Sequence, residues 1–282
     1  MSEGTRTRFF RKTGRAGLAA AHRSAQHGKT INMEILITND DGIYSEGIFA
    51  LYESLRKAGN VTVVAPDTER SAVGHAITLA DPLRVAEVSR RGKFFGYSTS
   101  GTPADCVKLA IRAIMKKKPD LVFSGINLGE NTGYNILYSG TVSGATEGAL
   151  LGIPSIAISL ATFVKPDFRC AASFARKLAA LARKNRLPAG TLLNVNVPAI
   201  EPARIKGVSV TSQSPTSFND WFDKRIDPHG RTYYWLTGKF SQKDDRPDSD
   251  VTAVNRGRIS ITPIQFDLTD HKFMNELKKW KF

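Results

Sequence analysis

Short runs of β-branched and aliphatic residues alternate with helical stretches from about residue 33 to residue 159. This alternation is the feature that most limits the possible folds. Between the first two runs, Ile48, Leu51 and Leu55 repeat at the spacing of one apolar helix face. Strands that alternate with helices predict an α/β fold, a Rossmann-like, doubly wound and mostly parallel sheet. The strand-like runs are Glu34–Thr38, Val61–Ala65, Leu121–Ser124 and Ser155–Ser159.

Local residue preferences predict where the helices begin and end. We expect Ser45 to cap the first helix and Gly59 to end it. Thr102 and Asp105 are placed as in a capping box, and they predict the start of a second helix. The remaining pattern predicts a helix near 168–184, a strand at 192–197, a final strand at 258–263 and a terminal helix at 270–280.

Residues 213–250 break this pattern, because they are polar and aromatic and fit no helical period. We interpret them as an extended arm or β-hairpin rather than as a second core. Aromatic side chains that an arm exposes usually indicate a surface that becomes buried in a contact, most simply with another subunit. The aromatic residues are Trp221, Phe222, Tyr233, Tyr234 and Trp235.

At 282 residues the chain is long enough for one large α/β domain, or for one domain with an appended arm. No run approaches the roughly 18–20 apolar residues of a membrane span, so we expect no membrane partner. Cys106 and Cys170 lie far apart and form no metal-binding pair. We interpret both as buried small side chains in a reducing compartment, and we expect a cytoplasmic protein.

The charge is strongly positive and unevenly distributed. The chain carries a formal net charge of +14, and residues 1–32 hold seven Lys and Arg side chains against one acid. The excess favours anionic partners, but in residues 33–282 it is too diffuse to indicate a specific nucleic-acid binder. Residues 1–32 fit a disordered basic extension, an organelle transit peptide, or sequence upstream of a true start at Met33.

Two adjacent carboxylates, Asp40 and Asp41, follow the first predicted strand. In a continuing strand they would point to opposite faces, whereas a turn at Gly42 lets them converge on one ligand. A metal or phosphate site is expected at this end of a strand in an open α/β sheet. The same four residues, 39–42, also suit an ordinary turn, and on their own they leave both interpretations open.

Two further polar, glycine-rich loops follow predicted strands, at 66–75 and 125–133. Since the carboxyl ends of parallel strands share one edge of the sheet, all three loops are expected there. Oxygen ligands from Asp, Ser and Asn suit Mg²⁺, Mn²⁺ or Ca²⁺ rather than zinc. His75, in the second loop, could be a general acid, a phosphate contact or simply a solvated side chain.

A helix is predicted to begin near Thr141, just after Ser139 and Gly140. Its free N–H groups and partial positive charge suit a phosphate, although the same residues also make an ordinary helix cap. The segment is neither a Walker loop nor a dinucleotide fingerprint.

From Met33 onward the chain resembles the stationary-phase survival protein (SurE) family of metal-dependent nucleoside monophosphate phosphatases. The matching segments occur in the order of the family over about 240 residues. They are Ile37–Gly42, Ala65-Pro66, Arg70-Ser71, Gly101–Val107, Ser124–Asn127, Gly129, Asn131, Tyr138–Ala145, Asp227-Pro228, Gly230-Arg231, Tyr233–Trp235, Ser249-Asp250 and Ile259–Pro263.

The resemblance implies functional residues and partners for this chain. It implies one divalent metal ion (Mg²⁺, Mn²⁺ or Ca²⁺), catalytic Asp40 and Asp41, and a homodimer or homotetramer formed through the arm. The implied metal ligands are Asp40, Asp41, Ser71 and Asn127, and the implied phosphate contacts are Asn39, Asn131, Ser139, Gly140 and Thr141.

These features predict a hydrolase that removes phosphate from nucleoside 5′-monophosphates, with 3′-monophosphates as further substrates to test. Metal-assisted attack by water is the expected mechanism, and an aspartyl-phosphate on Asp40 is the alternative. Two other functions stay open. One is a broader phosphatase that also shortens polyphosphate, and the other is a nucleotide- or RNA-binding regulator with a structural metal site.

Overall fold

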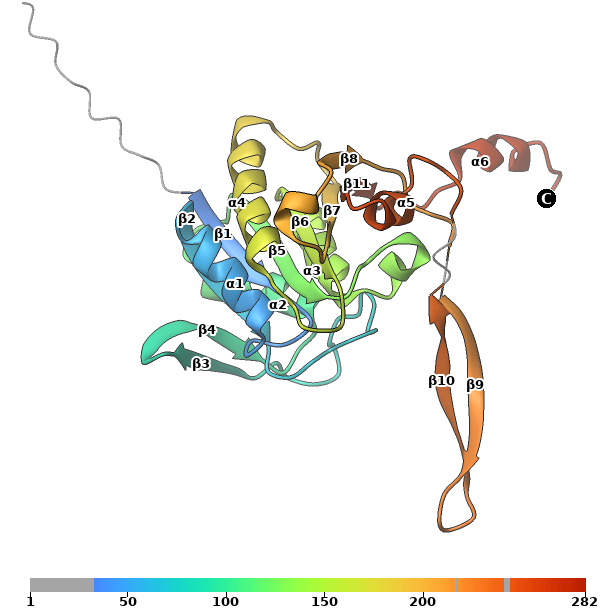
Figure 1. Cartoon of the computed structure of the whole chain (residues 1–282), viewed down its shortest axis with the longest axis horizontal. Coiled ribbons are helices and arrows are strands. Elements are labelled where there is room, and N and C mark those ends of the chain that lie inside the picture. Colours follow the sequence, from blue (N-terminus) through green and yellow to red (C-terminus); the bar gives the residue numbers. More distant parts are fainter. Residues whose placement is uncertain (1–32, 217, 241–243) are drawn as a thin grey trace, which may run out of the picture. The chain divides into compact units, whose positions relative to one another are not determined.

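The computed structural model describes residues 33–216, 218–240 and 244–282 (Figure 1). The prediction of a basic extension at 1–32 lies outside the described residues. No helix within the described part of the chain is long and apolar enough to cross a membrane.

Nine strands form one sheet in the order β3-β4-β2-β1-β5-β6-β7-β11-β8. The six strands from β4 to β7 run parallel, while β3 and β11 pair antiparallel with their neighbours β4 and β7. The prediction of a mostly parallel sheet is confirmed. The strands are β1 Met33–Thr38, β2 Gly59–Pro66, β3 Val85–Arg90, β4 Lys93–Thr99, β5 Leu121–Leu128, β6 Ser155–Ala161, β7 Thr191–Pro198, β8 Val208–Val210 and β11 Ile259–Gln265.

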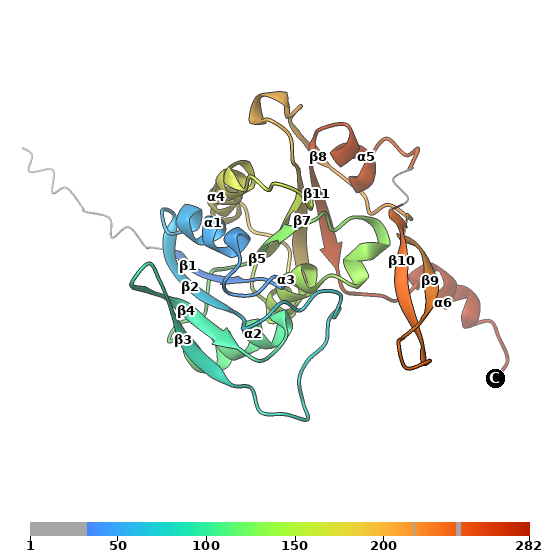
Figure 2. The same ribbon diagram turned by 60° about the horizontal axis from the view of Figure 1, so that its bottom comes forward.

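Helices cover both faces of this sheet, with α1 and α4 on one side and α2 and α3 on the other (Figure 2). Strand β1 shows how the sequence produces this layering. Ile35 and Ile37 pack into the core beneath α1 and α4, whereas Leu36 packs against residues of α2 on the opposite face. The α-helices are α1 Glu46–Leu55, α2 Pro103–Leu109, α3 Gly140–Leu150, α4 Arg169–Lys184, α5 Asp250–Asn255 and α6 His271–Leu277.

The predicted helix starts are confirmed, and one predicted helix end is wrong. Ser45 accepts a hydrogen bond from the N–H of Ile48, and Thr102 forms a complete capping box with Asp105. Gly59 does not end α1, because that helix stops at Leu55 and Gly59 opens β2. Beyond α2 the chain continues as a π-helical turn at Ala110–Ile114.

The arm forms a separate antiparallel sheet of β9 (Phe218–Ile226) and β10 (Thr232–Phe240). The predicted hairpin is therefore confirmed. Phe222 lies opposite Leu236, and Trp221 lies opposite Thr237 on the other face. Both faces carry exposed apolar side chains, namely Trp221, Phe222, Ile226, Tyr233, Tyr234, Trp235 and Leu236.

Candidate active site at the carboxyl edge of the sheet

The three glycine-rich loops meet because β2, β1 and β5 are parallel neighbours. The loops after β1 and β2 are joined through their backbones. The N–H of Arg70 donates to the carbonyl of Asp40 at 2.8 Å, and the N–H of Ile43 donates to that of Pro66 at 2.9 Å. Gly42 adopts φ +90°, a conformation that favours glycine and that turns the chain after the two aspartates.

Asp40 is buried against the first turn of α3. The hydroxyl of Thr141 donates to Oδ1 of Asp40, and a Cβ on Gly140 would lie only 2.7 Å from the Cβ of Asp40. Glycine at position 140 therefore lets the positive end of α3 approach the carboxylate closely. Burial raises the pKa of Asp40, while the hydrogen bonds from Thr141 oppose that rise.

Asp41 lies close enough to Asp40 for the two charges to interact. Burial, and then the charge of Asp40, raise the pKa of Asp41 to about 7. A hydrogen bond with the backbone of Leu128, the neighbour of Asn127, acts in the opposite direction. Two partly desolvated carboxylates side by side repel each other, so the site favours a positive charge.

Ser71 and Glu69 extend this acidic cluster along the second loop. The hydroxyl of Ser71 donates to the carboxylate of Glu69 at 2.5 Å, and the charge of Glu69 contributes to the raised pKa values of Asp40 and Asp41. Glu69 was not among the predicted site residues. Its only sequence signal is its place two residues before Ser71.

Asn39 and Asn127 both use their side-chain NH₂ groups to hold the local backbone. Asn39 donates to the carbonyl of Gly42 at 3.0 Å and to the hydroxyl of Ser45 at 2.9 Å. Its carbonyl oxygen is buried and has no hydrogen-bond partner. Asn127 donates to the carbonyl of Gly129 at 2.8 Å. In both side chains the NH₂ group is committed to the backbone, and the carbonyl oxygen is the atom suited to a cation.

The available donor atoms suit a hard divalent cation. The described residues contain no group of three or more His, Cys, Asp and Glu side chains placed to hold a metal ion. A set of two carboxylates, one hydroxyl and one amide oxygen does not need such a group, and Mg²⁺, Mn²⁺ and Ca²⁺ prefer oxygen ligands. The unpartnered carbonyl oxygen of Asn39 adds a buried polar atom to the same turn.

The start of α3 contains the predicted phosphate contacts Ser139, Gly140 and Thr141. Ser139 caps the helix by accepting the N–H of Val142 at 3.1 Å. Asn131 lies elsewhere along the edge, because its NH₂ group donates to the hydroxyl of Ser159 at 2.9 Å. The structure thus joins Asp40 directly to the start of α3, and it anchors Asn131 beside β6.

Comparison with known proteins agrees with this architecture. The family model "Survival protein SurE" matches residues 35–220. The chain belongs to the SurE family. It is 51% identical to the 5′-nucleotidase SurE of Syntrophobacter fumaroxidans over 88% of this chain and 99% of that protein. It is 50% identical to the 5′-nucleotidase SurE of Moorella thermoacetica over 87% and 95% of the two chains. The crystal structure of the SurE protein from Aquifex aeolicus superposes with a TM-score of 0.77, at 42% identity over 87% of this chain and 98% of that one.

A second charged cluster of this SurE chain lies on the side of α3. Glu147, whose side chain is 4% exposed, contacts His75 Nε2 at 3.0 Å and Lys108 Nζ at 2.6 Å. His75 belongs to the loop at 66–75, and the backbone of this loop is also fixed, because the N–H of Gly74 donates to the carbonyl of Tyr138 at 3.0 Å. Glu147 therefore fastens the loop that carries Ser71 onto α3. The contact between His75 and Glu147 was not predicted from the sequence, because the two residues lie 72 positions apart.

Glu147→Gln is expected to destabilise the protein in a pH-dependent way. Burial opposes ionisation of Glu147, but hydrogen bonds from His75 and Lys108 outweigh it and hold its pKa below the ordinary value. A lowered folded-state pKa stabilises the protein above the ordinary glutamate pKa, and this contribution is lost as pH falls through the lowered value. We expect a loss of about 1–3 kcal/mol at pH 7, measured by urea unfolding, and a smaller loss at acidic pH.

Glu46→Gln is the matched control, since Glu46 is exposed and paired with Arg90 at the surface. It is expected to change the free energy of unfolding by no more than about 0.5 kcal/mol. A pH-independent effect of Glu147→Gln would contradict the ion-pair account.

Proposed function

We propose that this protein is a divalent-metal-dependent 5′-nucleotidase, which hydrolyses nucleoside 5′-monophosphates to nucleoside and orthophosphate. The observation that carries the proposal is the pair Asp40 and Asp41, two adjacent and partly desolvated carboxylates of which Asp40 contacts the start of α3. Its support from related proteins is that relatives about 50% identical over nearly their whole length are named 5′-nucleotidase SurE. Nucleoside 3′-monophosphates are a further substrate class for the same site.

Four oxygen-bearing side chains are proposed to hold one divalent cation, Mg²⁺, Mn²⁺ or Ca²⁺. Such an ion, when bound, neutralises phosphoryl charge and makes a coordinated water more acidic. The backbone contact of Arg70 with Asp40 joins the second loop to the first, and the hydrogen bond of Asp41 with the backbone of Leu128 joins the third loop to the first. Ser71 is held within the second loop by its contact with Glu69. The proposed ligands are Asp40, Asp41, Ser71 and Asn127.

The residues of the chain would then position the reacting groups. The start of α3, from Ser139 to Thr141, presents N–H groups and a partial positive charge to the phosphate. Asn39 and Asn131 are the further predicted contacts. The NH₂ group of Asn39 already donates to Gly42 and Ser45, so Asn39 would have to give up one of these bonds to reach a phosphate, whereas Asn131 uses one amide hydrogen for Ser159 and has a second to donate. Asp40 and Asp41 would orient a water for in-line attack on phosphorus. The phosphorus–oxygen bond to the nucleoside breaks, and the nucleoside oxygen takes a proton. Direct attack by Asp40, giving an aspartyl-phosphate, is the alternative that trapping a phosphoenzyme would support.

Two other functions are separated by assay. A broader phosphatase would also release phosphate from polyphosphate. A nucleotide- or RNA-binding regulator would bind nucleotides without hydrolysing them. The net charge of +14 supports this alternative, because it favours anionic partners. We propose a cytoplasmic location, in keeping with two free cysteines, and no specific nucleic-acid partner.

Phosphate release from AMP or GMP in the presence of Mn²⁺ or Mg²⁺ tests the proposal. We expect turnover that a chelator abolishes and that Asp41→Ala lowers by at least about 100-fold, because the variant lacks a carboxylate that orients the reacting groups. Asp81→Ala is the control, since Asp81 is an exposed aspartate in the loop that follows β2. Unchanged turnover in the Asp41 variant would contradict the proposed site, and nucleotide binding without hydrolysis would favour the regulator.

The hairpin of β9 and β10 is proposed to join subunits into a dimer or a dimer of dimers. Its two faces expose apolar side chains such as Phe222 and Trp235, which a partner surface would cover. Replacing residues 219–238 with a short Gly-Ser turn is expected to yield monomers in sedimentation velocity, with near-native circular dichroism. An oligomer of unchanged size would contradict this role.

A further inference from the structure

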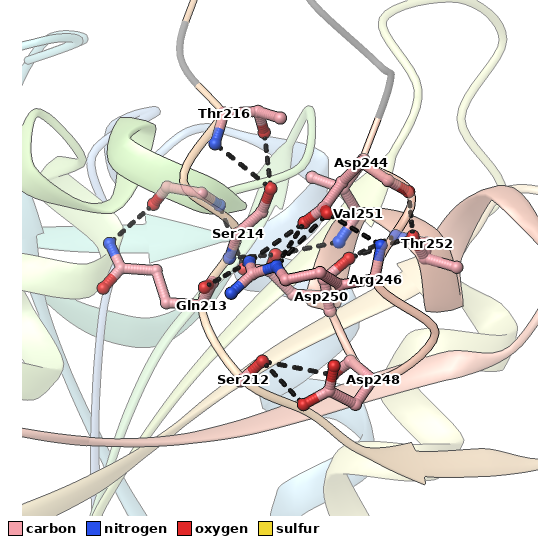
Figure 3. A network of polar contacts seen from close by, with 12 residues as sticks. Ser212, Gln213, Ser214, Thr216, Asp244, Arg246, Asp248, Asp250, Val251 and Thr252 are labelled. Carbon is pink, nitrogen blue, oxygen red and sulfur yellow. Dashed lines mark hydrogen bonds and ion pairs between the residues drawn. The ribbon is translucent and has the colours of Figure 1, made fainter.

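Asp250 is a fully buried carboxylate that binds three backbone N–H groups (Figure 3). It lies beside residues 213–216, the segment before β9 that we call the arm root. Its Oδ2 accepts the N–H of Gly133 at 2.9 Å. Its Oδ1 accepts the N–H groups of Ser214 at 3.0 Å and of Val251 at 2.8 Å. The three donors belong to three different segments of the chain. Gly133 lies in the loop after β5, Ser214 in the arm root and Val251 in α5.

Further hydrogen bonds join the same two segments, the arm root and the loop after β5. The side chain of Gln213 donates to the carbonyl of Gly133 at 2.9 Å, and the N–H of Tyr134 donates to the carbonyl of Thr216 at 2.9 Å. A Cβ on Gly133 would lie 2.4 Å from that same carbonyl oxygen, and Gly133 adopts φ +56°. Only glycine allows this close approach.

The segment that follows the hairpin, at residues 244–246, is bonded to the arm root and to α5. Arg246 pairs with Asp244 at 3.0 Å and also donates to the carbonyl of Gln213 at 2.9 Å. The hydroxyl of Thr252 in α5 donates to the carbonyl of Asp244 at 2.7 Å. Both ends of the hairpin thus meet at α5, next to Asp250 (Figure 3).

The loop held by Asp250 connects directly to the proposed phosphate contacts. Two residues before Gly133, the peptide groups of Asn131 are held by buried side chains of β7. Asn196 accepts the N–H of Asn131 at 2.8 Å, and Asn194 donates to its carbonyl at 2.8 Å. After Gly133, a 3₁₀-helical turn at Gly133–Leu137 leads into the start of α3. A shift of Gly133 would therefore be transmitted along one short segment toward Ser139.

We propose that Asp250 is a positioning residue for the nucleotidase reaction. It ties the arm root to segment 131–139 and so keeps the proposed phosphate contacts of this segment in position for the substrate. This inference rests on the proposed function. Asp250 lies on α5, and its carboxylate is already filled by three protein donors, so it acts through Gly133 rather than on substrate. It gives the arm root a physical connection to the active site that does not depend on contact between the hairpin and the reacting atoms.

The variant Asp250→Asn tests the connection with almost no change of shape. An amide has one acceptor oxygen, so the oxygen that serves Ser214 and Val251 can be kept while an NH₂ group faces the N–H of Gly133. The bond to Gly133 is lost and two donors oppose each other. Gln213→Ala removes the second contact with Gly133 without altering a buried charge. Asp248→Asn is the matched control, because Asp248 is exposed and its carboxylate accepts a hydrogen bond from the hydroxyl of Ser212 rather than from the segment of Gly133.

The measurements are kcat and KM for AMP, together with the inhibition constant of orthophosphate. We expect both KM and the phosphate inhibition constant to rise about tenfold in Asp250→Asn and by a smaller factor in Gln213→Ala, with kcat changed less than about threefold. Asp248→Asn should match the wild type. A loss of kcat in proportion to the folded fraction, with both constants unchanged, would show a purely structural role and overturn the proposal.

Hydrogen–deuterium exchange separates failure of this inference from failure of the proposed function. If the wild type hydrolyses no nucleotide, the proposed function fails, but exchange in the peptide spanning 129–139 still reports the connection. Faster exchange there in Asp250→Asn, compared with Asp248→Asn, is expected. Equal exchange in the two folded variants would overturn the link between Asp250 and this segment.

Discussion

The contact between the Asp40 carboxylate and the first turn of α3 is the interaction on which the rest of the site depends. It requires glycine at position 140, because a Cβ there would lie 2.7 Å from the side chain of Asp40. It places a buried carboxylate at the positive end of a helix, where N–H and hydroxyl donors partly offset the cost of burial. Its geometry fixes the distance between the turn after β1 and the segment proposed to bind phosphate.

The other loops are arranged around that contact by side chains that lie outside the site itself. Glu147 fastens the loop of Ser71 to the side of α3, and Asn194 and Asn196 hold the loop that follows β5. Asp250 extends this support to the root of the arm. The functional edge of the sheet is thus held by buried charged and amide groups, whose hydrogen bonds are directional, rather than by apolar packing alone.

Local patterns predicted the parallel sheet, the capped starts of α1 and α2, and the hairpin, because strand alternation and helix caps depend on neighbours within a few residues. The hairpin of β3 and β4 at the sheet edge was missed, since β3 is largely exposed and shows little apolar pattern. The turn at Asn39–Gly42 was predicted as a candidate site. No role was predicted for Glu69, Glu147 or Asp250, because their roles depend on contacts in space. For Glu147 and Asp250 these contacts are with residues far away in the chain.

Anomalous diffraction from crystals of this protein soaked in Mn²⁺ would locate the divalent cation. We expect one strong peak at the carboxyl edge of the sheet, with oxygen atoms of Asp40, Asp41, Ser71 and Asn127 within about 2.6 Å of the ion. A peak bound by other residues, or no peak at this edge under conditions that support nucleotide hydrolysis, would contradict the proposed metal site.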